Sequence, residues 1–361
     1  MDARQRVSDL RQRLAGESVS AFTATQASNV VYLTGLEGIF DEERPHIALV
    51  TPDECVLLTD SRYGEAATAS AAGSEWRVQV VRDDLWAAVE ALLGDLDRIA
   101  VEDTMPYRGH VAVEKRFGSR LVTSSGWVEE LRVRKSAEEL ACIAAAQELT
   151  DRGFTHILGF VRSGVSEAEI ALELEFYLRR MGSEGVAFEP IVASGPNSAL
   201  PHATVSGRVL GDGDFVMLDF GARVGGYCAD MTRTLVVGRA SERHREVYAN
   251  VLSANRAGLA AMRAGALGRD VDAAARAVIE AAGYGQYFGH GLGHGVGMEV
   301  HEAPGVGPRS TAELPASAVV TVEPGVYIPG FGGVRIEDLV VVEASGARVL
   351  TGSAKDLIEI Q

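Results

Sequence analysis

The sequence predicts two domains of different fold class, an α/β domain followed by an α+β domain. Its 361 residues suggest two domains, because a domain takes roughly 150 residues. In about the first 125 residues, short apolar strands alternate with alanine- or leucine-rich helices, which is typical of α/β folds. Beyond residue 185 the chain is rich in glycine and in β-branched strands, which two helices interrupt.

The N-terminal elements follow from hydrophobic spacing and turn residues. Leu10 and Leu14 lie one helical turn apart, and Thr-Pro-Asp separates two apolar runs as a turn would. We therefore expect helices over residues 7–14, 62–72 and 85–93, and strands over residues 19–23, 48–50, 55–58 and 99–101.

A basic segment, residues 131–136, interrupts this alternation. We place the domain boundary here, with an N-terminal domain over residues 1–130 and a C-terminal domain over residues 131–361. The alternative is an ordinary surface loop within one domain. The change in the character of the strands beyond the segment favours a boundary.

The C-terminal domain begins with two helix-start signals. Ser136 with Glu139, and Ser166 with Glu169, have the spacing of capping boxes. They predict helices that run to about residues 158 and 180. Further helices are expected over residues 242–264 and 271–282, and strands over residues 215–220, 228–236, 319–322 and 334–342.

Composition excludes several classes of function. The formal net charge of −16 argues against binding nucleic-acid phosphates or anionic membranes. The three cysteines, with no CxxC spacing, exclude a disulfide framework or a cysteine zinc cage and favour a reducing cytoplasm. The N-terminus lacks the apolar core of a secretory signal, and no apolar stretch approaches the ~18 residues of a membrane helix.

The first chemical signal is a predicted hairpin that contains two aspartates. If its turn centres on Val224-Gly225, Asp219 faces Asp230, with Cβ atoms about 5 Å apart. Two carboxylates so placed repel each other, and a divalent cation held by both would offset the repulsion. The alternative is a register slip of one residue that points one aspartate to solvent.

The second signal is the glycine-rich segment 289–297, which contains His290 and His294. Five glycines in nine residues argue against a helix and predict a tight loop or irregular strand. The segment matches neither the dinucleotide nor the phosphate-loop pattern. One histidine here would usually be a structural hydrogen-bond donor, but His301 downstream strengthens the case for ligands or substrate contacts.

The third signal is a set of charged residues near predicted strands. Glu323 ends a β-branched strand before a Pro-Gly turn, and Arg335 and Glu337 share one face of the next strand. Their alternative, a surface salt bridge, is disfavoured because the strand runs into residues 339–342, which are apolar. Two Asp, two Glu and one His have the composition of a two-metal hydrolase site, with Mn, Co or Zn favoured.

The ordered candidate ligands resemble the dinuclear site of the pita-bread metallopeptidases, family M24, which includes methionine aminopeptidase, aminopeptidase P and prolidase. Residues 29–35 and 59–63 resemble the N-terminal domain of the proline-specific branch. The resemblance implies a creatinase/prolidase-like α/β domain and a pita-bread domain with a curved antiparallel sheet. It implies two divalent ions per subunit, manganese first and cobalt or zinc as alternatives, held by Asp219, Asp230, His294, Glu323 and Glu337.

The resemblance also implies roles for neighbouring residues. His202 and His301 would contact substrate and the developing oxyanion, and His290 would lie near the substrate pocket. Arg335 would order the site or contact substrate. Glu323 would both ligate metal and shuttle a proton. The implied catalytic residues are therefore His202, His301, Glu323 and Arg335, and the implied substrate-binding residues are His202, His290, His301 and Arg335.

The implied function is hydrolysis of the Xaa-Pro bond, preferentially as an Xaa-Pro dipeptidase. An Xaa-Pro aminopeptidase acting on longer peptides is the alternative, followed by a non-catalytic pita-bread binding protein. Gly305 stands where many prolidases have an arginine that grips the dipeptide carboxylate, and Arg309 could substitute. The resemblance further implies a cytoplasmic homodimer whose N-terminal domain serves oligomerisation or substrate access, with proline-containing peptides as partners.

Overall fold

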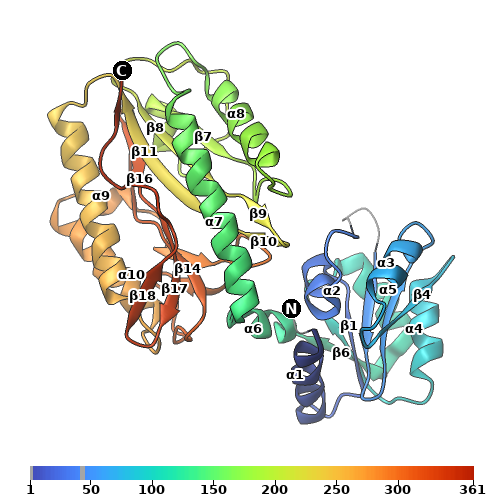
Figure 1. Ribbon diagram of the computed structural model, residues 1–361. Coiled ribbons are helices and arrows are strands. Elements are labelled where there is room, and N and C mark those ends of the chain that lie inside the picture. Colours follow the sequence, from blue (N-terminus) through green and yellow to red (C-terminus); the bar gives the residue numbers. More distant parts are fainter. Residues whose placement is uncertain (1–2, 41–44) are drawn as a thin grey trace. The chain divides into compact units, whose positions relative to one another are not determined.

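The structure, a computed structural model, describes residues 3–40 and 45–361. The chain forms two compact units, Met1–Arg132 and Val133–Gln361 (Figure 1). Within the described ranges, no helix has both the length and the apolar character needed to cross a membrane.

The N-terminal unit is built on one six-stranded mixed sheet with the order β4-β3-β2-β1-β5-β6. The β1–β2 and β2–β3 pairs are antiparallel and the other pairs are parallel. The strands are β1 (Ala21–Ala24), β2 (Ile47–Val50), β3 (Cys55–Thr59), β4 (Trp76–Val80), β5 (Ile99–Glu102) and β6 (Leu121–Ser124). The helices are α1 (Ala3–Gly16), α2 (Ala27–Thr34), α3 (Gly64–Ser70), α4 (Leu85–Leu93), α5 (Tyr107–Phe117) and α6 (Trp127–Val133), with a short 3₁₀ turn at Gly118–Arg120.

This arrangement confirms the predicted α/β class, and it contains several elements that the sequence did not predict. Helix α2 was missed because its Asn-Val-Val-Tyr sequence has the composition of a strand. The helix ends at Gly35, whose φ of 70° needs the conformational freedom of glycine. Strand β4 is an edge strand and only its first residue is fully buried, so it lacks the apolar run that identifies a central strand.

The C-terminal unit contains two pairs of helices. They are α7 (Ala137–Leu158), α8 (Glu167–Arg180), α9 (Glu242–Ala261) and α10 (Gly268–Ala281). Ser136 and Ser166 both form the predicted capping boxes. Figure 1 shows the two pairs on opposite sides of the strands, and each pair covers a separate hydrophobic core.

The strands of this unit form a four-stranded sheet, β19-β11-β8-β7, and a five-stranded sheet, β13-β12-β14-β17-β18. Two-stranded ribbons β9-β10 and β15-β16 complete it, and every pair is antiparallel except β11–β19. The bounds are β7 (Ile191–Ser194), β8 (Phe215–Phe220), β9 (Arg223–Val224), β10 (Tyr227–Cys228), β11 (Met231–Val237), β12 (Gly293–Gly295), β13 (Glu302–Val306), β14 (Val319–Val322), β15 (Gly325–Ile328), β16 (Gly332–Arg335), β17 (Asp338–Glu343), β18 (Gly346–Val349) and β19 (Glu359–Ile360), with 3₁₀ turns at Gly195–Ala199 and Gly285–Tyr287.

The predicted register of the aspartate hairpin is wrong. Asp219 lies opposite Thr232 instead of Asp230. The turn centres on Gly225-Gly226, which both have positive φ, of 57° and 74°. A tight hairpin turn needs positive φ at both central residues, which the β-branched Val224 of the predicted turn resists. The partner of Asp219 therefore moves by two positions, and an even shift keeps the aspartates on the same face.

Two predicted strands are interrupted at candidate ligands. The strand expected over residues 228–236 breaks before β11, and Asp230 lies in the break. The strand expected over residues 334–342 breaks between β16 and β17, and Glu337 lies there. The expectation that Arg335 and Glu337 share one strand is therefore wrong. In a regular strand, successive side chains alternate between the two faces of the sheet. The breaks free Asp230 and Glu337 from this alternation, so that both carboxylates can point into the same space.

Candidate metal centre and active site

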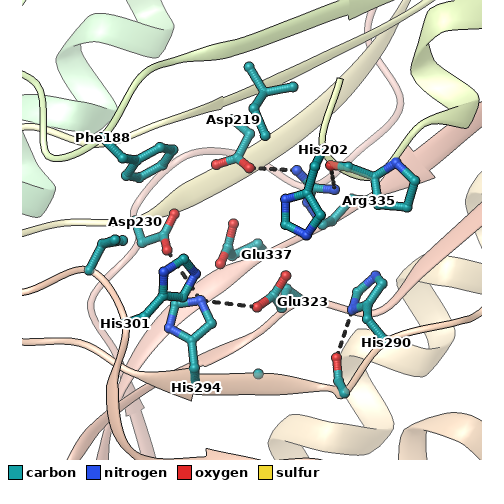
Figure 2. A pocket seen from close by; sticks show the side chains of 15 residues that line it. Phe188, His202, Asp219, Asp230, His290, His294, His301, Glu323, Arg335 and Glu337 are labelled. Atoms are coloured by element: carbon teal, nitrogen blue, oxygen red, sulfur yellow. Dashed lines mark hydrogen bonds and ion pairs between the residues drawn. The ribbon is translucent and has the colours of Figure 1, made fainter. Parts of the chain in front are cut away.

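The candidate site residues line one cavity of about 260 Å³ in the C-terminal unit (Figure 2). Each comes from a strand, a strand end or the loop beside it, so separate parts of the sheets converge on the same space. The structure thus brings together all nine side chains singled out in the sequence: His202, Asp219, Asp230, His290, His294, His301, Glu323, Arg335 and Glu337.

Three candidate ligands, from different segments of the chain, have donor atoms close enough to share one ion. One ligand atom each from Asp230, His294 and Glu337 lies within 4.8 Å of the others. His294 Nε2 is 3.5 Å from Asp230 Oδ2 and 3.2 Å from Glu323 Oε1. His294 Nδ1 donates a hydrogen bond to the carbonyl oxygen of Gly295 at 3.1 Å, which orients Nε2 toward the carboxylates.

The charges in the cavity are strongly coupled. Burial raises the pKa of Asp219, and burial with neighbouring carboxylates raises the pKa values of Asp230 and Glu337 well above their usual range. For Glu323, burial is outweighed by the hydrogen bond and charge of His294, which lower its pKa to about 2. Burial likewise opposes the charged form of His294, yet Glu323 raises its pKa to about 9.

The donor set fits divalent cations. Three buried carboxylates, those of Asp219, Asp230 and Glu337, and the half-buried Glu323 face one guanidinium and one imidazole that ionises, so acidic groups outnumber basic ones. Asp219 Oδ1 is buried and accepts no hydrogen bond from the described residues. An unbonded buried carboxylate oxygen is costly unless a ligand satisfies it. Oxygen donors with one imidazole suit manganese, cobalt or zinc.

Arg335 is fully engaged at the cavity wall. Its Nη2 donates to Asp219 Oδ2 at 2.5 Å, and its Nη1 donates to the hydroxyl of Tyr327 at 2.8 Å and to the carbonyl of Pro201 at 3.1 Å. Its Nε donates to Thr232 Oγ1 at 2.9 Å. The guanidinium therefore orients one candidate ligand and the segment that precedes His202.

The three histidines outside the candidate ligand set differ in exposure. His202 and His301 are exposed, whereas His290 is half-buried, and all three line the cavity. His290 Nδ1 donates to the carbonyl of Gly291 at 2.7 Å, so its Nε2 accepts from the hydroxyl of Tyr327 at 2.9 Å. Burial lowers the pKa values of His290 and His301. Both imidazoles are therefore neutral near pH 7.

Several residues of the site carried no recognisable signal in the sequence. Phe188, Ile191 and Val300 form an apolar part of the lining. No motif in the sequence distinguishes them from other apolar residues, so only the folded structure identifies them. Tyr327, whose hydroxyl joins Arg335 to His290, lies four residues after Glu323 and was visible only through its proximity to that motif.

The two residues considered for carboxylate recognition do not line the cavity. Gly305 lies within β13 and is exposed to solvent. Arg309 is exposed and is not among the lining residues. The prediction that Arg309 could replace the missing arginine finds no support in the geometry of this cavity.

Comparison with known proteins shows similarity along nearly the whole chain. A model of the creatinase/prolidase N-terminal domain matches residues 6–134, and a model of metallopeptidase family M24 matches residues 141–344. The Xaa-Pro dipeptidase of Pyrococcus furiosus is 32% identical to this chain, and the match covers 98% of this chain and 100% of the dipeptidase.

Solved structures agree with this similarity. An Xaa-Pro dipeptidase from Bacillus anthracis is 38% identical with a TM-score of 0.93, covering 99% of this chain and 100% of that one. An X-Pro aminopeptidase from Thermotoga maritima is 35% identical with a TM-score of 0.88, covering 98% and 100%. The predicted pita-bread and creatinase/prolidase-like domains are thereby confirmed. The chain belongs to metallopeptidase family M24 and carries the creatinase/prolidase N-terminal domain.

Proposed function

We propose that this chain is a metal-dependent peptidase that hydrolyses the Xaa-Pro bond, preferentially as an Xaa-Pro dipeptidase. One observation carries the proposal: five candidate metal ligands, three further histidines and an apolar wall converge on a single cavity. Relatives that carry the name Xaa-Pro dipeptidase match over nearly their whole length, which supports the same substrate class.

The residues proposed to hold two divalent ions per subunit are Asp219, Asp230, His294, Glu323 and Glu337. Manganese is the first choice, with cobalt or zinc as alternatives. When bound, the two ions would lower the pKa of a shared water and polarise the scissile carbonyl. The remaining chemistry falls to side chains of the chain itself.

Glu323 is the proposed proton carrier. It would accept a proton from the attacking water and deliver it to the proline nitrogen, which must leave as an amine. His202 and His301 are exposed to the cavity and would donate hydrogen bonds to the oxyanion that develops on the scissile carbonyl. Arg335 would act through Asp219, whose carboxylate it holds, and His290 would contact substrate.

The substrate bond is a tertiary amide, because proline has no backbone N–H. A site for it therefore needs shape and apolar contact in place of a hydrogen bond to that nitrogen. Phe188, Ile191 and Val300 offer such contact within the cavity. They are the residues we propose to receive the apolar parts of the peptide.

A second candidate function, Xaa-Pro aminopeptidase acting on longer peptides, has a specific observation in its favour. Among the residues that the structure describes, Arg335 is the one arginine that lines the cavity, and it is bound to Asp219. A dipeptide carboxylate would therefore need another partner. A longer peptide, with its carboxylate outside the cavity, would not.

We further propose a cytoplasmic homodimer in which residues 1–130 serve oligomerisation or substrate access and residues 131–361 carry the chemistry. The cysteines support a reducing compartment, since within the described residues none of Cys55, Cys142 and Cys228 forms a disulfide. Light scattering after size-exclusion chromatography tests the proposed oligomer.

The test of function compares Xaa-Pro dipeptides with Xaa-Pro-Yaa tripeptides, using enzyme stripped by chelator and reloaded with manganese. We expect stripping to abolish hydrolysis and reloading to restore it, with dipeptides as the preferred substrates. Exclusive cleavage of tripeptides would instead establish the aminopeptidase. Full activity in thoroughly stripped enzyme would contradict the metal-dependent mechanism itself.

A further inference from the structure

Helix α10 carries an ion pair on the side that contacts the glycine-rich segment. Arg276 Nε donates to Asp272 Oδ2 at 2.8 Å, and Arg276 Nη2 donates to Asp272 Oδ1 at 2.9 Å. The two residues are one helical turn apart, and the side chains of Asp272 and Arg276 are 2% and 20% exposed. Neither residue lines the cavity. A bidentate pair of this kind has a fixed orientation.

The pair also binds the backbone of residues 288–292, which form neither helix nor strand. Arg276 donates through Nη1 to the carbonyl of Phe288 at 3.0 Å and through Nη2 to the carbonyl of His290 at 2.7 Å. Asp272 Oδ1 accepts from the backbone N–H of Leu292 at 3.0 Å. Because backbone groups outside regular structure need other partners, these side chains fix three alternate residues of the segment.

The fixed segment presents His290 to the cavity. The guanidinium of Arg276 also lies 4.2 Å from the centre of the Phe288 ring, which packs edge-on against the His290 ring. On its other side the His290 ring accepts from Tyr327. His294, by contrast, has its backbone N–H bound to Thr321 Oγ1 of β14. The ion pair therefore acts on His290 more directly than on His294.

We infer that Asp272 and Arg276 are positioning residues that hold His290 in the cavity from outside it. The inference rests on the proposed function, in which His290 contacts substrate. Loosening the pair should weaken substrate binding in ground and transition states alike, and so raise KM with little change in kcat or metal content.

The test uses Arg276→Lys, which keeps the charge but cannot bridge Asp272 and both carbonyls. We expect KM for an Xaa-Pro dipeptide to rise about tenfold, which equals the lower end of the ~10–100-fold losses that follow when a residue that orients a metal ligand is changed. Arg179→Lys is the matched control, because Arg179 forms an exposed pair with Glu175 at the same spacing on α8. We expect this control to match the wild-type enzyme.

A double-mutant cycle with His290→Ala separates positioning from general stability. If Arg276 acts through His290, Arg276→Lys costs almost nothing further in the His290→Ala background. An equal cost in both backgrounds would overturn the inference. Asp272→Asn, which keeps a carbonyl acceptor for Leu292, serves in the same cycle if Arg276→Lys does not fold.

An experiment without turnover distinguishes this inference from the proposed function. In NMR spectra of ¹⁵N-histidine protein, assigned with His290→Ala, Arg276→Lys should shift the His290 ring signals, and Arg179→Lys should not. Unchanged His290 signals would overturn the inference even if the enzyme is active. An inactive wild-type enzyme would count against the proposed function alone, because the spectra would still report the position of His290.

Discussion

Two groups of buried charged residues lie side by side in the C-terminal unit. In one group the carboxylates outnumber the cations, and in the other the chain itself supplies cationic partners. In the cavity, Asp230 and Glu337 have raised pKa values because burial and neighbouring carboxylates oppose their charge. Asp338 follows Glu337 directly, yet it accepts from Arg233 Nη2 at 3.0 Å and from Lys355 Nζ at 2.6 Å. The chain thus supplies cationic partners for Asp338, whereas the carboxylates in the cavity outnumber the cations near them.

The balanced group, which we call the ion network, consists of Arg233, Asn255, Asp338 and Lys355. Arg233 donates to the backbone carbonyl of Glu337, and Lys355 Nζ donates to Asn255 Oδ1 at 3.0 Å. Asn255 donates to the carbonyls of Val322 at 3.0 Å and Ile336 at 3.4 Å, which precede Glu323 and Glu337. The ion network, whose charges are paired within the chain, therefore holds the backbone beside Glu323 and Glu337, whose carboxylates lie in the cavity.

The largest expected effect comes from removing the central anion of the ion network. Asp338→Asn leaves Arg233 buried, 1% exposed, without its carboxylate partner. Breaking such a buried pair costs about 3–5 kcal/mol in the free energy of unfolding. Urea unfolding of the metal-free protein measures it. A loss below about 1 kcal/mol would mean that the network does not stabilise the fold.

A smaller effect is expected from filling the cavity. Manganese at a hundred times its Kd should stabilise the wild-type protein by about 2.7 kcal/mol. Asp230→Asn should lose most of this gain, because it removes one of the three candidate ligands whose atoms lie within 4.8 Å of one another. Thermal unfolding of chelated protein titrated with manganese measures both. The same gain in both proteins would place the metal elsewhere.

The smallest effect is expected at the edge of the ion network. Lys355 is 25% exposed and shares Asp338 with Arg233. Lys355→Met should therefore cost about 1.5 kcal/mol, the low end for one hydrogen bond to a charged group. Metal content, measured by atomic absorption, should stay at the wild-type level. Loss of metal would show that the network and the cavity are less separate than their charges suggest.

The cavity was largely predictable from sequence because its candidate metal ligands lie in local motifs. Glu323 before a Pro-Gly turn and His294 among glycines are visible within a few residues. Helices α7 and α8 were predictable for the same reason, since a capping box spans only four residues. The hairpin register was not, because it depends on which turn residues adopt positive φ.

No local sequence motif predicts the ion network. Arg233 and Asp338 are 105 positions apart, and neither stands in a recognisable motif. Asp338 adjoins the candidate ligand Glu337, and the sequence alone does not show which of two neighbouring carboxylates is a candidate ligand and which forms an ion pair. Their opposite roles arise from partners that only the folded chain brings near one of them.

The most direct test of this account makes the same substitution in both groups. Two carboxylates about 5 Å apart repel by about 3 kcal/mol at an effective dielectric constant of ~20. Asp230→Asn removes a carboxyl group whose charge is opposed by burial and by neighbouring carboxylates, and Asp338→Asn removes a carboxylate that Arg233 and Lys355 neutralise. The free energy of unfolding of both variants, measured without metal at pH 7, compares them with the wild-type protein. We expect Asp230→Asn to match or exceed wild type while Asp338→Asn falls by several kcal/mol; equal losses in both would contradict the account.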